Sequence, residues 1–217
     1  MICIIPARGG STRLPGKNTM DFFGKLIIDH VIEQANNAGV FNDIVVSTDD
    51  IDIYNRYKPY SVIRSLETSG DVAEDLVLKE VCDYGDLYHA CRIYPTAALL
   101  TPERIHQGFM VFVDSGVDCV AECQQYAHPP QRGFTIDDSL TGTYLKGDII
   151  GKRTQDLIPV YHSAGTFMFF NVNALKKPLN ERTIKWLPVG EMEAQDIDTA
   201  EDFEMAKLKY MYREMRK

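Results

Sequence analysis

The chain has 217 residues, of which 45% are hydrophobic and 25% charged, a composition typical of a globular protein. Its 23 basic and 31 acidic residues give a formal net charge of −8, which excludes a broad basic surface for duplex nucleic acid. An anionic ligand would therefore need a local basic cluster. The longest apolar runs fall far short of the ~20 residues that a membrane span requires.

The first residues and the cysteines bear on the cellular compartment. The chain opens on an apolar stretch ending at Pro6, with neither a basic leader nor a long apolar core, so we expect a strand and not a secretion signal. The cysteines are odd in number and lack CxxC spacing, which disfavours a disulfide framework and a zinc ribbon. We expect a cytoplasmic protein with reduced, mostly buried thiols at Cys3, Cys82, Cys91, Cys119 and Cys123.

Apolar runs suited to strands alternate with helical patterns along most of the chain. Residues 2–5 and 43–48 are predicted strands, and residues 26–38 and 201–213 are predicted helices. Gly39 follows the first helix at the place of a left-handed C-cap residue. The alternation indicates βαβ units, and so an α/β fold with a mainly parallel sheet in one domain over residues 1–217.

Two short motifs predict helix starts. Thr101, Pro102 and Glu103 offer an N-cap, a proline at the first helical position and an acid in the first turn. Thr199 and Asp202 form a variant of the capping box. Both motifs mark places where a strand or extended segment has just ended.

The α/β rhythm breaks between residues 124 and 159. This stretch is rich in Pro, Gly, Thr and Asp around two short alternating segments, residues 131–136 and 142–145. We expect a small β-rich excursion. Because it is too short to bury a core of its own, it must pack on the parent domain or on a second subunit.

The loop after the first strand is the most informative stretch of the sequence. Arg8, Arg13 and Lys17 fall within ten residues of an acidic chain, among glycines that let backbone N–H groups approach an oxyanion closely. In an open α/β sheet, ligands bind in the crevice outside the carboxyl ends of the strands, where this loop must lie. The pattern favours a polyphosphate ligand over a merely solvated basic turn.

The same loop does not match two common nucleotide motifs. Gly10 and Gly16 have five residues between them where a Walker A sequence has four, and Lys17 is followed by Asn18 where serine or threonine should bind magnesium. The loop is not a GxGxxG motif either. A P-loop ATPase and a dinucleotide-dependent dehydrogenase are therefore disfavoured.

A pair of acids near the C-terminus suggests a metal site. In an extended segment the side chains of Asp196 and Asp198 leave one face while Ile197 leaves the other. Two such carboxylates suit Mg²⁺, which completes its shell with water and substrate phosphates. The alternative is that they cap the helix that begins near Thr199. For Asp49 and Asp50, which follow another strand, we prefer a capping role.

Other catalytic chemistries find little support in the sequence. The five histidines show no HExxH or other metal-ligand spacing, so catalytic zinc is not expected. The sequence contains no GxSxG nucleophile elbow and no pattern of an activated cysteine. We therefore expect the nucleophile to come from the substrate.

Five segments in order along the chain resemble cytidylyltransferases that activate nine-carbon acidic sugars, the acylneuraminate and pseudaminate enzymes. Thr12 and Ala98 depart from the family pattern, which usually has lysine and proline there. The Arg153 to Gly165 region is most similar to the pseudaminate branch. The segments are Ile4-Ile5-Pro6-Ala7-Arg8-Gly9-Gly10-Ser11 with Lys17-Asn18, Val46-Ser47-Thr48-Asp49-Asp50, Tyr94-Pro95-Thr96-Ala97, Arg153-Thr154-Gln155-Asp156-Leu157 with Tyr161-His162-Ser163-Ala164-Gly165, and Gln195-Asp196-Ile197-Asp198-Thr199.

The resemblance implies a Rossmann-like nucleotidyltransferase fold and the reaction of CTP with pseudaminic acid to give CMP-pseudaminic acid and pyrophosphate, for surface glycans or flagellin. It also implies Mg²⁺ as cofactor and assigns roles to particular residues. Phosphate binding falls to Arg8, Gly10, Ser11, Arg13 and Lys17, nucleoside contacts to Asn18 and Thr96, sugar contacts to Tyr94, Gln155, Tyr161 and His162, and metal binding to Asp196 and Asp198. Arg8, Lys17 and Asp198 are the expected catalytic residues.

Assembly follows from the excursion at residues 124–159. Its exposed edges predict pairing with a second copy in a two-fold homodimer, and the resemblance points the same way. Arg153 lies near the end of the excursion, and its planar guanidinium suits the carboxylate of a nonulosonic acid. We expect Arg153 to contact the substrate bound to the opposite subunit. For His162, a structural role is as plausible as a sugar contact.

Three alternatives remain open at this point. The enzyme could use N-acetylneuraminic, legionaminic or another 2-keto-3-deoxy sugar acid. It could be a glycosyltransferase that uses a nucleotide-sugar, since Asp196 and Asp198 also fit the Asp-x-Asp pattern, although their place before the last helix argues against it. It could also bind a nucleotide-sugar without catalysis.

Overall fold

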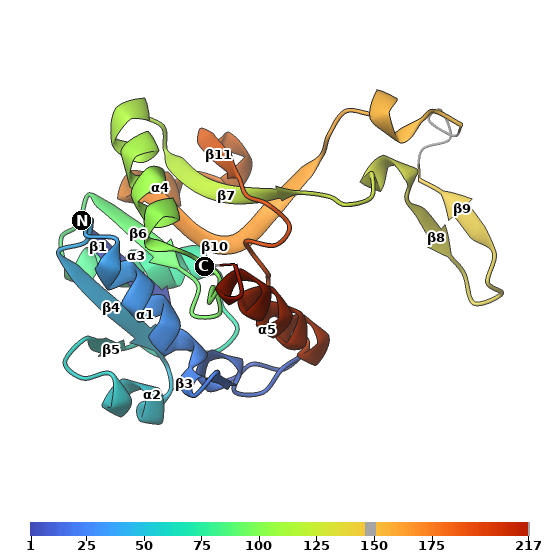
Figure 1. Cartoon of the computed structure of the whole chain (residues 1–217). Helices are drawn as coiled ribbons and strands as arrows, with labels where there is room; N and C mark the ends of the chain where they lie inside the picture. The colour runs from blue at the N-terminus through green and yellow to red at the C-terminus, as the bar shows by residue number, and fades with distance from the viewer. Residues whose placement is uncertain (146–150, 217) are drawn as a thin grey trace.

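A seven-stranded sheet in the order β11-β7-β10-β6-β1-β4-β5 forms the centre of the protein, which a computed structural model describes over residues 1–145 and 151–216 (Figure 1). Residues 146–150 of the predicted excursion lie outside the described residues. The strands of this sheet are β1 (Ile2–Pro6), β4 (Asp43–Thr48), β5 (Ser61–Ile63), β6 (His89–Ile93), β7 (Cys119–Gln125), β10 (Tyr161–Asn171) and β11 (Ile184–Pro188).

Most of the strands run parallel. β1 pairs in parallel with β4 and β6, β4 with β5, and β7 with β11, whereas β10 runs antiparallel between β6 and β7. The predicted α/β fold with a mainly parallel sheet is confirmed. Because β1, β4 and β6 point the same way, the loops that follow them meet at one edge of the sheet.

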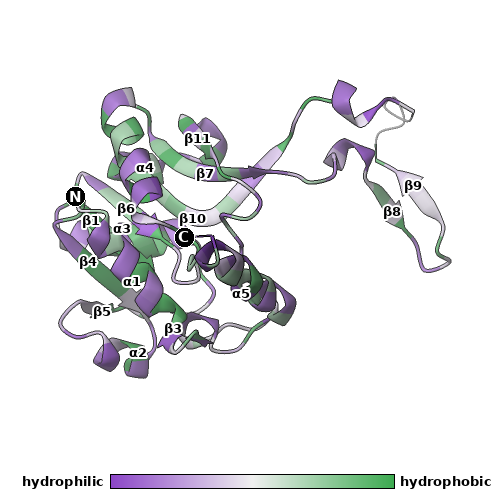
Figure 2. Cartoon of the chain, in the orientation of Figure 1, coloured by the Kyte–Doolittle hydropathy of each residue, from purple (hydrophilic) through white to green (hydrophobic). Residues whose placement is uncertain are grey.

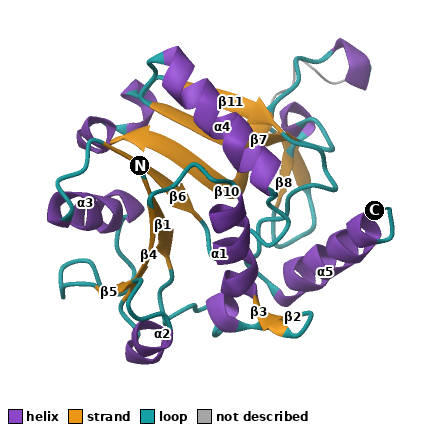
Figure 3. Cartoon of the chain, turned by 60° about the vertical axis from the view of Figure 1, so that its left-hand side comes forward, coloured by secondary structure: helices purple, strands orange, loops and turns teal. Residues whose placement is uncertain are grey.

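Helices cover both faces of the sheet (Figure 3). In β1, Cys3 and Ile5 belong to the core beneath α1 and α4, while Ile4 belongs to the core beneath α3. This alternation is the two-residue period of a strand that is buried on both faces. In the described part of the chain, no helix is long and apolar enough to span a membrane. The helices are α1 (Ile27–Asn37), α2 (Ile51–Arg56), α3 (Glu74–Tyr84), α4 (Pro102–Ser115) and α5 (Ala200–Glu214).

Shorter elements connect these layers. A small antiparallel pair, β2 and β3, precedes α1, and a second pair, β8 and β9, lies far from the main sheet (Figure 1). The bounds of these elements are β2 (Asp21–Phe22), β3 (Lys25–Leu26), β8 (Phe134–Ile136) and β9 (Gly142–Tyr144), with 3-10 helices η1 (Lys17–Thr19), η2 (Pro130–Arg132), η4 (Thr154–Asp156), η5 (Val172–Lys176) and η6 (Leu179–Glu181).

The predicted helix boundaries are confirmed by their hydrogen bonds. The Thr101 side chain accepts a hydrogen bond from the backbone of Arg104 at the start of α4. Thr199 and Asp202 form a complete capping box at the start of α5. Gly39 follows α1 with a φ of 66°, the left-handed conformation expected after a helix.

All five cysteines are buried and free, as predicted. Burial raises the pKa of Cys82 to about 12 and that of Cys119 to about 11. It also raises the pKa of Cys3, Cys91 and Cys123. Since the thiolate is the reactive form, these thiols are inert in the folded protein.

Residues 124–145 and 151–159 form an arm that projects from the sheet (Figure 1). β7 and β10 lead out to the arm, and the hairpin of β8 and β9 lies near its far end (Figure 1). The predicted strand at residues 131–136 is shorter than expected, because residues 130–132 form a 3-10 turn and pairing begins at Phe134. The apolar residues exposed on the hairpin include Phe134, Ile136 and Tyr144. Figure 2 shows β8 largely in the green of hydrophobic residues and β9 in pale, nearly neutral colours.

The contact between α4 and the sheet depends on Gly108. A Cβ atom at Gly108 would lie 2.6 Å from two ring atoms of Phe167, whose side chain is fully buried. Alanine favours a helix interior by about 1 kcal/mol over glycine, but overpacking costs about 1–3 kcal/mol. We expect Gly108→Ala to lower the free energy of unfolding in a denaturant titration. Asp114→Ala, at an exposed position of α4, is the control and should not lower it.

Candidate active site

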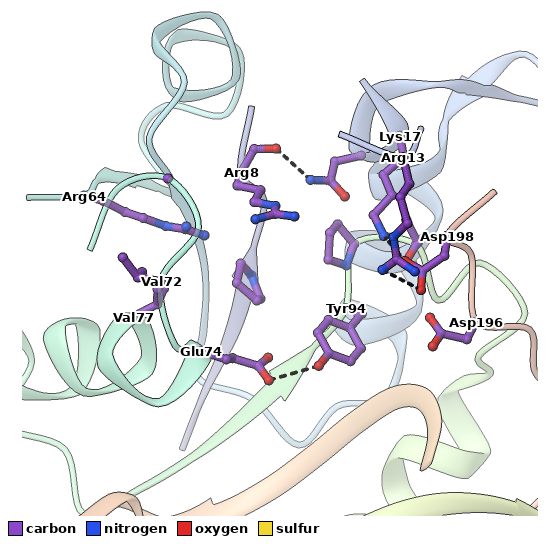
Figure 4. Close-up of a pocket in the computed structure, with 15 residues that line it drawn as sticks. Arg8, Arg13, Lys17, Arg64, Val72, Glu74, Val77, Tyr94, Asp196 and Asp198 are labelled. Atoms are coloured by element: carbon purple, nitrogen blue, oxygen red, sulfur yellow. Dashed lines mark hydrogen bonds and ion pairs between the residues drawn. The ribbon is translucent and has the colours of Figure 1, made fainter. Parts of the chain in front are cut away.

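A cavity of about 340 Å³ opens at the carboxyl ends of β1 and β6 (Figure 4). One side is formed by the loop after β1, another by the loop between β5 and α3, and a third by the segment that precedes α5. The predicted residues that line the cavity are Arg8, Arg13, Lys17, Asn18, Tyr94, Thr96, Asp196 and Asp198. Segments from both ends of the chain therefore form one site.

Two basic side chains of the loop that follows β1 (residues 7–17, here called the front loop) contact Asp198. The Lys17 Nζ donates to Asp198 Oδ1 at 3.0 Å and to the carbonyl oxygen of Ile197 at 2.8 Å. The Arg13 Nη2 lies 2.8 Å from Asp198 Oδ2 (Figure 4). Each carboxylate oxygen thus faces one cation, and these contacts hold the front loop against the segment before α5.

Arg8 also lines the cavity, and its side chain lies apart from those of Arg13 and Lys17 (Figure 4). Its Nη1 lies 2.5 Å from Oδ1 of Asp71, whose side chain is fully exposed. The Arg8 carbonyl oxygen accepts a hydrogen bond from the buried Asn18 side chain at 2.9 Å (Figure 4). Asn18 therefore fixes the path of the loop as well as lining the cavity. An exposed ion pair such as Arg8–Asp71 is weak, so Arg8 is available to an anionic ligand.

Asp49 ties together two loops that flank the cavity. Its Oδ1 accepts from the Gly9 amide at 2.9 Å, and its Oδ2 accepts from the Gly70 amide at 2.8 Å. Burial acts to raise the pKa of Asp49, but the amide hydrogen bonds from Gly70 and Gly9, together with the charge of Arg64, lower it overall. Asp49 is a positioning residue that the sequence did not reveal.

Asp50 has the capping role that was predicted for this pair. Its side chain accepts from the amides of Asp52 and Ile53 at the start of α2. A Cβ atom at Gly9 would overlap the Asp50 carboxyl group, so only glycine lets the front loop pass this close to the helix start.

The pair of acids before α5 has the predicted alternation. Ile197 is fully buried in a cluster with Phe22 and Phe203, and both Asp196 and Asp198 line the cavity. Burial and, secondarily, the nearby charge of Asp198 raise the pKa of Asp196. A bound cation would offset both effects. Neither acid caps α5, because Thr199 and Asp202 do so.

A metal at this place would have few protein ligands. Within residues 1–145 and 151–216, no group of three or more His, Cys, Asp or Glu side chains is placed to hold a metal ion. Two carboxylates nevertheless match the way Mg²⁺ binds in nucleotide sites, where water and substrate phosphates supply the remaining ligands. The raised pKa of Asp196 and the shared cavity fit such an ion.

Glu74 and Tyr94 form another wall of the cavity, and Arg92 contacts both of them. The Tyr94 hydroxyl donates to Glu74 Oε2 at 2.9 Å (Figure 4), and the Arg92 Nε lies 2.9 Å from Glu74 Oε1. The Arg92 guanidinium lies 3.7 Å from the centroid of the Tyr94 ring. These contacts fix the Tyr94 ring. The sequence analysis did not identify Glu74 or Arg92 as site residues. Arg92 could have been found, because it is a charged residue inside the mostly apolar strand at residues 89–93.

Arg64 was also missed by the sequence analysis. It lines the cavity, although most of its side chain is buried, and it donates to the hydroxyl and the carbonyl oxygen of Ser47 at 3.1 and 3.0 Å. Burial lowers the pKa of Arg64, and a buried cation makes strong hydrogen bonds to any anion or carbonyl group that reaches it.

Gly10 and Ser11 belong to the front loop but do not line the cavity. Gly10 is exposed. The Ser11 hydroxyl is buried, and no hydrogen-bond partner for it is found among the described residues. In this geometry the arginine and lysine side chains of the loop face the cavity, and contacts of Gly10 and Ser11 with phosphate remain a prediction.

The remaining predicted sugar-binding residues lie outside the cavity. Tyr161 and His162 line a separate hollow beside Trp186, because β10 runs toward the arm before Gly165. The ring centroid of His162 lies 4.7 Å from that of Tyr126, a packing role that suits the structural alternative.

Gln155 lies in the 3-10 helix η4 of the arm, and Arg153 lies directly before that helix (Figure 1). Gln155 lines another small cavity there, formed by residues on both sides of the excursion. Arg153 is exposed, and its Nε lies 2.9 Å from Asp156. Within one chain, the structure does not bring these sugar-binding candidates to the cavity that holds Lys17.

This arrangement defines a nucleotide-dependent α/β enzyme of the nucleotidyltransferase class. Solved structures share the fold. CMP:2-keto-3-deoxy-manno-octonic acid synthetase complexed with CTP has a TM-score of 0.72 and 19% identity, with 98% of each chain covered. 4-Diphosphocytidyl-2C-methyl-D-erythritol synthase from Anaerococcus prevotii has a TM-score of 0.64 and 14% identity, with 97% of each chain covered.

Sequence comparisons narrow the class. The family profile described as Cytidylyltransferase matches residues 2–211, and the chain belongs to this family. A pseudaminic acid cytidylyltransferase from Campylobacter jejuni is 32% identical over 96% of this chain and 95% of its own length. An N-acylneuraminate cytidylyltransferase from Streptococcus agalactiae is 32% identical over 93% of this chain, which spans 51% of that relative.

Proposed function

We propose that this cytidylyltransferase transfers the CMP group of CTP to pseudaminic acid and releases pyrophosphate. The observation that carries the proposal is the match to a relative named for this activity, which covers nearly all of both chains. The basic front loop and the paired carboxylates around one cavity support it chemically.

In the proposed reaction, the anomeric hydroxyl oxygen of the sugar attacks the α-phosphorus of CTP in line. The new P–O bond forms as the bond to the bridging oxygen breaks, pyrophosphate leaves, and the hydroxyl proton passes to water. Such a transfer depends on positioning and charge neutralisation more than on covalent chemistry. Arg8, Arg13 and Lys17 would bind the phosphates, while Tyr94 would contact the sugar.

Asp196 and Asp198 would hold Mg²⁺ in this proposal. When bound, Mg²⁺ would withdraw negative charge from the phosphates of CTP. Asp198 pairs with Arg13 and Lys17. These two cations therefore lie beside the acids that would hold the ion, where they could donate hydrogen bonds to phosphate oxygens of CTP.

Pyrophosphate release tests the proposal directly. The purified protein is mixed with CTP and Mg²⁺, and then with pseudaminic, legionaminic, N-acetylneuraminic or 2-keto-3-deoxyoctonic acid. We expect the highest kcat/KM for pseudaminic acid. A higher value for another acid would reassign the substrate. Absence of turnover with all four acids would overturn the activity and leave the glycosyltransferase or a non-catalytic nucleotide-binding protein.

We further propose that the protein acts as a homodimer through the arm of residues 124–159. The hairpin carries exposed apolar residues that its own chain does not cover, and Phe134, Ile136 and Leu145 are all more than half exposed. Burying such residues against a second copy would remove apolar surface from water. Arg153, which lies directly before η4 in the arm, would then reach the sugar site of the neighbour.

Subunit mixing tests the shared site. Arg153→Ala and Lys17→Ala subunits should each be inactive alone, whereas a hybrid dimer would combine one intact Arg153 and one intact Lys17 in a single site. We expect activity to reappear after the two variants are mixed under exchange conditions. Two differently tagged copies of one variant serve as the control. Hybrids that form but stay inactive would place Arg153 outside the neighbouring site.

A further inference from the structure

The backbone of β10 is irregular where it passes the cavity. Ser163 pairs with Cys123 of β7, and the next pair is Met168 with Ala121, so extra residues of β10 are inserted between the two pairs. Gly165 lies in this bulge and has a φ of 65°, in the left-handed region. Bulges of this kind redirect the backbone next to functional sites.

Gly165 lies directly against Asp196. A Cβ atom built on Gly165 would lie 2.8 Å from Asp196 Cγ, 2.9 Å from Asp196 Oδ1 and 3.0 Å from Asp196 Cβ. Real Cβ atoms do not approach other heavy atoms this closely, so any other residue would push the carboxyl group away. Figure 4 shows the Asp196 carboxyl group beside Tyr94 and Asp198 on the same wall.

The segment that carries Asp196 has little room to withdraw. The carbonyl oxygen of Ala194 accepts from Lys209 Nζ at 3.0 Å and from Gln124 Nε2 at 3.3 Å, and both donors are buried. On the other side of Asp196, Ile197 is fully buried. The backbone is therefore anchored before and after the acid, and the face of Gly165 closes a third side.

We infer that Gly165 is a positioning residue for Asp196. The missing side chain at residue 165 lets the Asp196 carboxyl group lie in the cavity beside Asp198, where the two acids can share one cation. This inference rests on the proposed metal role of the two acids. Loss of an outer contact that orients a ligand typically weakens metal binding by roughly 10–100-fold.

A matched pair of variants separates this effect from backbone strain. Gly165→Ala and Gly116→Ala both place alanine at a positive φ, 65° and 64°, but a Cβ at Gly116 has no heavy atom within 4 Å. Both variants should lose thermal stability through the positive φ, and Gly165→Ala should lose more because its Cβ atom also collides with Asp196. Only Gly165→Ala should bind Mn²⁺ about tenfold or more weakly in the presence of CTP without sugar, measured by electron paramagnetic resonance. It should also need correspondingly more Mg²⁺ for half-maximal turnover.

A second substitution keeps the inference testable if the Gly165→Ala variant does not fold. Asparagine tolerates positive φ better than alanine does but still carries a Cβ atom, so Gly165→Asn should show the same defect in Mn²⁺ binding with less strain. Wild-type Mn²⁺ affinity in either folded variant would overturn the inference. Absence of Mn²⁺ binding to the wild-type protein would overturn it too. Weakened Mn²⁺ binding in the variants of a protein that releases no pyrophosphate would uphold the inference and overturn the proposed activity.

Discussion

Replacing Lys17 with alanine should lower kcat/KM for pyrophosphate release by about 10²-fold or more. The Lys17 side chain is only 21% exposed, so its ammonium group would interact with phosphate in a partly desolvated cavity, where a charge-assisted hydrogen bond is strong. The substitution also removes the hydrogen bonds to Asp198 and to the Ile197 carbonyl oxygen that join the front loop to the segment before α5. Steady-state kinetics with varied CTP measure the effect.

The control for this variant is Lys25→Ala. Lys25 forms an exposed ion pair with Glu33, and both side chains are about half exposed, so its loss should leave kcat/KM unchanged. Thermal unfolding of both variants establishes that each is folded. Wild-type kinetics in Lys17→Ala would remove the front loop from the mechanism.

Asp198→Asn should raise the Mg²⁺ concentration needed for half-maximal activity by at least tenfold and should lower turnover at ordinary Mg²⁺ concentrations. A neutral amide is a weaker ligand for a hard cation than a carboxylate is, and metal affinity typically falls roughly 10–100-fold even when an outer partner is lost. The variant also leaves Arg13 and Lys17 without their shared carboxylate. A Mg²⁺ titration of pyrophosphate release measures the shift.

Asp114→Asn is the matched control, because Asp114 is exposed on α4 and does not line the cavity. Its Mg²⁺ titration should superimpose on that of the wild-type protein. If the titration of Asp198→Asn also superimposes, Asp198 is not a metal ligand and serves to hold the two cations in place.

The features predicted correctly from the sequence are those that local physics determines. Thr101 and Thr199 cap helices because their side chains reach amides within the same turn. Asp196 and Asp198 share a face because an extended backbone alternates its side chains and Ile197 needs burial. Such patterns need no knowledge of distant contacts.

The features that the sequence analysis missed depend on segments far apart in the chain. Glu74 joins the site only because α3 begins beside the end of β6, where Tyr94 and Arg92 meet it. Arg64 faces the cavity because a buried Ser47 on the neighbouring strand holds its guanidinium. A charge inside the apolar strand at residues 89–93 marks Arg92, but no local pattern marks Glu74 or Arg64.

The sugar-binding candidates show a different limit. Tyr161 and His162 lie on the same strand as Gly165, but the direction of β10 carries them toward the arm and away from the cavity. A sequence motif shows the order of these residues, but it does not show that the backbone of β10 changes direction at the bulge between Ser163 and Met168. In the proposed homodimer, the position of these residues relative to a sugar site depends on the second subunit as well as on the single chain.

The burial of all five thiols has a practical consequence for labelling. A thiol reagent finds no reactive group on the folded surface, so its rate of reaction reports how often the core opens. A single cysteine placed at the exposed Thr143 in β9 would then be the one site that reacts quickly in the native protein. A spin label or fluorophore could be attached to the hairpin without removing any natural cysteine, and distances between labels could locate the arms in solution.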